Sequence, residues 1–139
     1  YQITSALENM RRKGALFVPG TVAEWLDCGN KNATVFTNRR LLDMHRGNHL
    51  VSPTLKKENS VIVEPCFIGD NVEIIHSVVG PYVSIGNNSR IINSVVQNSI
   101  IQSGALIDSA NIDNSIIGNH VEYRGGKKEL SIGDFSTHA

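Results

Sequence analysis

The chain has 139 residues, which is enough for one domain with a real core. Its 13 basic and 13 acidic residues give a formal net charge of zero, so nothing electrostatic favours a nucleic acid or a membrane surface as partner. No apolar run is long enough to cross a membrane. Cys28 and Cys66 are too few for a disulfide framework and lack metal-site spacing, so we expect reduced thiols in a cytoplasmic protein.

The first predicted element is a helix close to the N-terminus. Its apolar residues recur at helical spacing, at Ile3, Leu7 and Met10. Thr4 or Ser5 can cap its start, and Gly14 is placed to end it in a left-handed conformation.

Two short strands and a second helix are expected next. Residues 15–27 are predicted as strands on either side of Pro19-Gly20, a turn dipeptide. Asn30 can cap a helix that runs to about Met44. Residues 51–60, with Pro53 and a lysine pair but little periodicity, are predicted as a linker.

A short repeat dominates the chain from residue 61 to residue 139. A branched apolar residue, a glycine and two small or polar residues precede another apolar residue, first in Ile68-Gly69-Asp70-Asn71-Val72. Apolar anchors follow one another at steps of five or six, at Ile62, Ile68, Ile74, Val79, Ile85, Ile91, Val96, Ile101, Ile107, Ile112 and Ile117. Self-similarity at such a short period indicates a solenoid.

The spacing of the anchors specifies the kind of solenoid. A step of about six residues is one short strand and a corner, and three such sides close a triangular coil, so stacked coils form a parallel β-helix of hexapeptide repeats. Glycine and asparagine are expected to supply corners with positive φ, and stacked Asn and Ser side chains to bond free backbone groups. An antiparallel sandwich would need hairpin turns every 8 to 12 residues, which this period does not supply. Resemblance to the hexapeptide class implies a left-handed coil.

The repeat is interrupted near the C-terminus. Residues 123–129 (Tyr-Arg-Gly-Gly-Lys-Lys-Glu) break the period and are predicted as a loop extruded from one corner. Residues 130–136 return to the repeat and are predicted as a last partial coil.

The most distinctive non-repetitive phrase is Glu24-Trp25-Leu26-Asp27-Cys28-Gly29-Asn30. It resembles the Trp-Leu-Asp-x-Gly segment that closes the catalytic domain of sugar-phosphate nucleotidyltransferases of the glucose-1-phosphate thymidylyltransferase type. Residues 1–4 resemble the stretch just before it, although Ser5 stands where that family usually has Asp and Cys28 where it usually has Thr. The order of a catalytic domain followed by a left-handed β-helix fits a known subgroup.

This resemblance implies a role for Asp27. In that family the matching Asp helps to hold the Mg²⁺ that bridges the phosphates while a sugar 1-phosphate attacks a nucleoside triphosphate and pyrophosphate leaves. The alternative for Asp27 is a surface carboxylate that, together with Asn30, caps the following helix.

The resemblance also implies that residues 1–50 are the end of a catalytic domain. Because the chain starts at Tyr1 without Met, we expect a fragment of a longer enzyme. No glycine-rich nucleotide loop is present, so the chain alone is expected to be inactive.

Two other functions stay open. Hexapeptide-repeat acyltransferases use a histidine as general base, and His120, beside the predicted loop, is the better candidate than His76. The spacing predicts that His76 shares its repeat position with Asn93 and Asp108, which favours a plain corner residue. A solenoid with flat sides also suits assembly of a homo-oligomer. The base and the sugar stay undetermined.

Overall fold

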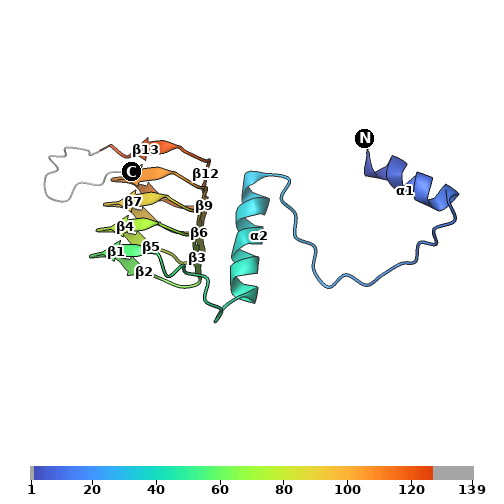
Figure 1. The fold of residues 1–139 in the computed structure, drawn as a ribbon, viewed down its shortest axis with the longest axis horizontal. Helices are drawn as coiled ribbons and strands as arrows, with labels where there is room; N and C mark the ends of the chain where they lie inside the picture. The colour runs from blue at the N-terminus through green and yellow to red at the C-terminus, as the bar shows by residue number, and fades with distance from the viewer. Residues whose placement is uncertain (1, 127–139) are drawn as a thin grey trace, which may run out of the picture.

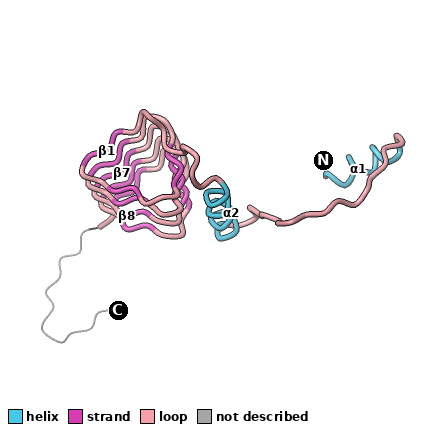
Figure 2. Tube along the Cα trace, turned by 90° about the horizontal axis from the view of Figure 1, so that it is seen from below, coloured by secondary structure: helices cyan, strands magenta, loops and turns pink. Residues whose placement is uncertain are grey.

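Residues 2–126 are described in a computed structural model. Residues 51–126 wind into a triangular prism of stacked coils, seen nearly end on in Figure 2. One helix lies along a side of this prism, and another lies apart from it at the end of an extended segment (Figure 1). The fold is mainly β, as the repeat predicts.

Three parallel sheets form the sides of the prism. The charged sheet, named for its outer face, contains β1 (Lys56–Glu58), β4 (Glu73–Ile75), β7 (Arg90–Ile92), β10 (Leu106–Asp108) and β13 (Glu122–Arg124). The valine sheet contains β2 (Val61–Ile62), β5 (Val78–Val79), β8 (Val95–Val96) and β11 (Asn111–Ile112). The helix-covered sheet contains β3 (Cys66–Ile68), β6 (Val83–Ile85), β9 (Ser99–Ile101) and β12 (Ile116–Ile117).

The core is a column of branched side chains inside the prism. Each strand pairs with the strand one coil later, Ile74 with Ile91 and Ile91 with Ile107. The predicted anchors are confirmed as core, because nine of them are buried and the two end ones, Ile62 and Ile117, pack against these. Each fully buried Ile or Val stabilises the fold by about 1.5–3 kcal/mol relative to an exposed one.

Asparagine supplies most of the tight corners. Two columns hold seven of the non-glycine residues with positive φ in residues 2–126: Asn59, His76, Asn93 and Ser109 in one, and Asn71, Asn88 and His120 in the other. The repeat's glycine has a different purpose at Gly69 and Gly86, neither of which has positive φ. A Cβ on Gly86 would lie 2.6 Å from the backbone nitrogen of Ser103 in the next coil, so glycine is needed there for close stacking.

Serine side chains form the predicted ladder along one corner. The Oγ of Ser60 accepts the N–H of Ser77 at 2.9 Å, the Oγ of Ser77 accepts that of Ser94 at 3.0 Å, and the Oγ of Ser94 accepts that of Ala110 at 3.1 Å. These bonds satisfy backbone donors that strand pairing leaves free at the corner.

The first coil begins earlier than predicted. Residues 51–60, predicted as a linker, contain β1, and Lys57 lies in register with Ile74. Val51 also forms a bridge with Ile68. Lys57 occupies the inward position of the first coil, where no layer of side chains packs on its outer side. An apolar residue is not required there, so the sequence shows no anchor at this position.

Helix α2 (Lys31–Met44) follows the predicted bounds. The Asn30 side chain accepts the N–H of Ala33 at 3.0 Å, which confirms the predicted cap. Val35 and Leu42 are buried, and Ser84 on the helix-covered sheet donates to Asn38 at 2.6 Å. The helix therefore runs across several coils (Figure 1).

The segment before α2 has no core of its own. Helix α1 (Ile3–Arg12) buries none of its residues, and its N-cap is Gln2 without a side-chain bond, so Thr4 and Ser5 lie inside the helix and the predicted cap is wrong. Gly14 has a φ of 89°, as predicted for the helix end. The two strands predicted in residues 15–27 are absent, because a strand needs a sheet and none of the described residues offers this segment one.

The coil continues beyond the point where the sequence predicts a loop. Tyr123 pairs with Ile107 in β13, so the loop prediction is wrong at least for Tyr123 and Arg124. Tyr123 is the last inward position among the described residues and is exposed, which explains why no aliphatic anchor marks it. The predicted last coil at residues 130–136 lies outside the described residues.

Candidate functional site

Asp27 lies in a short anchored turn just before α2. Its Oδ1 accepts the N–H of Gly29 at 3.1 Å, and its backbone carbonyl accepts the hydroxyl of Thr37 at 2.7 Å. A Cβ on Gly29 would lie 3.1 Å from the other carboxylate oxygen, so glycine lets the carboxylate fold over the turn. The structure thus holds the backbone of Asp27 against α2 while its carboxylate stays exposed.

The exposed carboxylate can serve as one ligand of a divalent cation. Mg²⁺ in phosphoryl-transfer sites uses one or two protein carboxylates, with phosphate oxygens and water as the remaining ligands. No group of three or more His, Cys, Asp or Glu side chains that could hold a metal occurs in residues 2–126. Asp27 therefore stands as a single possible ligand in this part of the chain. Its bond to the Gly29 N–H also suits the alternative, a surface carboxylate that acts with Asn30 at the start of α2.

His76 is a corner residue. It has a φ of 48°, and its Nε2 lies 3.2 Å from the amide nitrogen of Asn59 in the coil before. The strand register pairs Ile75 with Ile92 and Ile92 with Asp108, so the structural equivalents of His76 are Asn93 and Ser109. The predicted equivalence with Asp108 is wrong by one residue, because the coil shortens from 17 to 16 residues between β7 and β10.

His120 occupies another corner column, above Gly104. It has a φ of 56°, and its ring occupies the space that a side chain on Gly104 would need, since a Cβ there would collide with Nδ1. Within residues 2–126 the ring makes no hydrogen bond that would orient it as a base. Its role as an acyl-transfer base stays a prediction.

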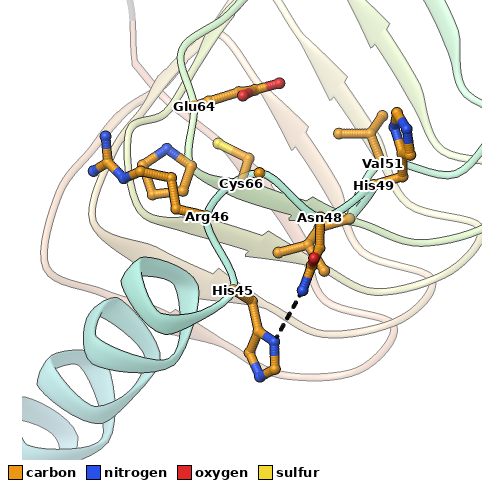
Figure 3. A pocket seen from close by; sticks show the side chains of 10 residues that line it. His45, Arg46, Asn48, His49, Val51, Glu64 and Cys66 are labelled. Atoms are coloured by element: carbon orange, nitrogen blue, oxygen red, sulfur yellow. Dashed lines mark hydrogen bonds between the residues drawn. The ribbon is translucent and has the colours of Figure 1, made fainter.

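A cavity lies between the end of α2 and the first coil (Figure 3). It is lined by polar side chains that sequence reasoning did not bring together, His45, Arg46, Asn48, His49, Glu64 and Cys66. His45 and Asn48 contact each other at 3.3 Å, and the Cys66 thiol donates to the carbonyl of Val63 at 3.1 Å. Burial raises the pKa of the Cys66 thiol, so it is a poor nucleophile near neutral pH.

A cluster of α2 and corner residues fixes the helix to the solenoid. The guanidinium of Arg39 lies 4.4 Å from the ring centre of Tyr82, and Arg46 donates to the Tyr82 hydroxyl at 3.3 Å. At the other end of the helix Lys31 donates to the carbonyl of Asn114 at 2.7 Å. The turn that contains Asp27 is therefore held in a defined place relative to the coils.

Comparison with known proteins gives one informative match. The chain is similar to a glucose-1-phosphate thymidylyltransferase. The relative comes from Streptomyces antibioticus and is 31% identical in an alignment 112 residues long that covers 69% of this chain. The alignment covers 31% of the relative, so the chain spans about a third of the length of the curated relative it matches.

The thymidylyltransferase match agrees with the fold. The similarity and the parallel solenoid together fit the C-terminal β-helix region of such an enzyme, which confirms the resemblance first seen in the Trp25-Leu26-Asp27 phrase. No family model matches the chain, and no solved structure matches it. Neither helix in the described part of the chain is long and apolar enough to cross a membrane.

Proposed function

We propose that this chain is the C-terminal part of an enzyme that transfers a nucleotidyl group from a nucleoside triphosphate to a sugar 1-phosphate. The observation that carries the proposal is the similarity to a glucose-1-phosphate thymidylyltransferase, together with the Trp25-Leu26-Asp27 phrase. The reaction forms a bond between the sugar phosphate and the α-phosphorus, and pyrophosphate is the leaving group.

Exposed apolar side chains support a missing neighbour for the first 29 residues. Leu16 and Trp25 are 88% and 83% exposed, and Ile3, Val18 and Val22 are also largely exposed. Exposed apolar surface of this extent marks an interaction site. In the proposed enzyme the upstream catalytic domain covers it, and residues 15–27 regain the sheet partner that the predicted strands require.

In this proposal Asp27 supplies one carboxylate to Mg²⁺. When bound, the ion neutralises charge on the reacting phosphates. The protein's own contribution is positional: the Gly29 N–H and the Thr37 hydroxyl fix the turn, and α2 fixes the turn to the solenoid. The nucleotide-binding loop belongs to the proposed upstream domain, so the chain alone does not catalyse the reaction.

The test is an Asp27→Asn variant of the longer protein. We expect its rate of pyrophosphate release to fall by at least about tenfold, because loss of a metal ligand costs at least as much as loss of an outer-shell group. An Asp113→Asn variant, changed at an exposed carboxylate on the coils, is the matched control and should keep its rate. A full rate in the Asp27→Asn variant would remove Asp27 from the site.

We further propose that the solenoid assembles the enzyme into a homo-oligomer. Two of its three sides are free of α2, and flat parallel sheets offer a regular surface to a second copy (Figure 2).

A further inference from the structure

The outer face of the charged sheet carries an ordered pattern of charge. Its strands point alternate residues outward, because Ile74, Ile91 and Ile107 point into the core. Two outward columns result. The first column is Lys56, Glu73, Arg90, Leu106 and Glu122, and the second is Glu58, Ile75, Ile92, Asp108 and Arg124.

The middle of the first column is already neutralised within the chain. Glu73 accepts from Lys56 at 3.1 Å and from Arg90 at 2.9 Å, and beside it the second column presents Ile75 and Ile92. The charges at the top of the face differ, because neither Glu122 nor Arg124 forms an ion pair with any other residue in the range 2–126. Within residues 2–126 the charges of this face without an ion pair are therefore Glu58, Asp108, Glu122 and Arg124, and the apolar Ile75 and Ile92 lie between them in the centre.

We propose that this face pairs with the same face of a second copy, with the two solenoids parallel. The inference rests on the proposed oligomer and adds its surface and orientation. A two-fold axis parallel to the stack sets each first-column residue opposite the second-column residue of the same coil. Lys56 then meets Glu58 of the second copy and Glu122 meets Arg124, so opposite charges meet at both ends.

The antiparallel arrangement is less favourable. It sets each column against itself in reverse, so opposite charges again meet at the ends, Lys56 with Glu122 and Glu58 with Arg124 of the second copy. Asp108 meets an apolar residue in both arrangements, so the difference lies at the centre, where Arg90 meets Arg90 in the antiparallel dimer and Ile92 in the parallel one. Like charges opposed at an interface are unfavourable. The valine sheet is a weaker candidate, because its stripe of Val61, Val78 and Val95 has no charge that would fix a register.

The expected complex is weak and depends on salt. A face three residues wide is small beside the roughly 800 Å² that each partner buries in a stable complex, so we expect a dissociation constant in the micromolar range. Because exposed charges contribute to it, raising the ionic strength should weaken it.

The experiment is sedimentation equilibrium of the 139-residue chain at tens of micromolar with charge-reversal variants. Arg124→Glu sets Glu122 against a glutamate at two places in the dimer, so the dissociation constant should rise about tenfold or more. The double exchange Glu122→Arg with Arg124→Glu restores both opposite pairs in the parallel dimer and should restore association. In the antiparallel dimer the same exchange would set arginine against Lys56 and glutamate against Glu58, and association would stay weak.

The controls separate this inference from the proposed oligomer. Asp113→Arg changes a charge beside the valine sheet and should leave association unchanged, whereas Val78→Lys places a charge on that sheet. An oligomer lost in Val78→Lys but kept in Arg124→Glu overturns the choice of face while the oligomer stands. A chain that is monomeric at every concentration overturns both. A dimer weakened by Arg124→Glu and not rescued by the exchange overturns the parallel orientation.

Discussion

Gly86 and Gly118 hold the same place in the repeat but different places in the stack. A Cβ on Gly86 would meet the backbone of the next coil at 2.6 Å, whereas the nearest atom to a Cβ on Gly118 within residues 2–126 is a methyl of Val121 at 3.7 Å. We therefore expect Gly86→Ala to reduce the free energy of unfolding by about 1–3 kcal/mol, the usual cost of overpacking. Gly118→Ala should change it by less than about 0.5 kcal/mol.

Urea unfolding of the two variants checks this difference. The pair controls for helix and strand propensity, since both replace a glycine at the same repeat position without positive φ. Equal losses in the two variants would show that the glycine serves the corner itself and not the contact between coils.

Among elements, α2 depends on one unusual corner residue. Tyr82 has a φ of 63°, a conformation that suits asparagine better, and its ring contacts Arg39 and Arg46. In a Tyr82→Asn variant we expect the amides of α2 to exchange with solvent about threefold to tenfold faster, because the cation–π contact and the hydroxyl bond are lost. The coil amides should keep their protection.

Hydrogen exchange by mass spectrometry measures both parts at once. Asn98→Ala is the matched control, because Asn98 is another left-handed corner and makes no hydrogen bond to α2 within residues 2–126. Unchanged exchange in α2 of the Tyr82→Asn variant would mean that the helix is held by Val35 and Leu42 alone.

The ion pairs of Glu73 with Lys56 and Arg90 on the charged sheet make the stability of the fold depend on pH. Hydrogen bonding from Lys56, aided by the charges of Lys56 and Arg90, holds the pKa of the Glu73 carboxyl below its ordinary value. A pKa that folding lowers stabilises the folded state above the unfolded pKa, and this contribution is lost as pH falls through the folded pKa. Glu73→Gln should therefore unfold more easily than the unchanged chain at pH 7 and equally at pH below the folded pKa.

Urea midpoints of both proteins across acid pH measure the Glu73 effect. The difference at pH 7 should shrink in high salt, because these charges are exposed. A difference that persists at the lowest pH would show that the glutamine disturbs packing and not an ion pair.

The sequence predicts the interior of the solenoid better than its ends. Ile91 and Ile107 are recognisable because a layer above and a layer below require an aliphatic residue. Lys57 and Tyr123 occupy the same inward position in the first and last described coils, but both are exposed and neither is aliphatic. The sequence therefore predicts a linker for residues 51–60 and a loop at Tyr123. The register slip at Asp108 follows from a change in coil length that only pairing reveals.

At the scale of the whole molecule, the solenoid has a hydrophobic core of its own, whereas the segment before α2 has none. The coils enclose their own core, whereas Leu16, Val18 and Trp25 face solvent. The period of the repeat predicts the coils. A single carboxylate on a turn belongs to no repeat, so only the resemblance of the Trp25-Leu26-Asp27 phrase to a known family points to Asp27. The cavity beside Cys66 has no sequence signal either, since it is made by residues from both sides of the junction between α2 and the first coil.

The most direct test of the account is pyrophosphate release from a nucleoside triphosphate and a sugar 1-phosphate in the presence of Mg²⁺. The longer protein that contains this chain should release pyrophosphate only when both substrates are present, and the 139-residue chain alone should release none above background. Release by the chain alone, or none by the longer protein with any of the common nucleotides and sugar 1-phosphates, would contradict the account.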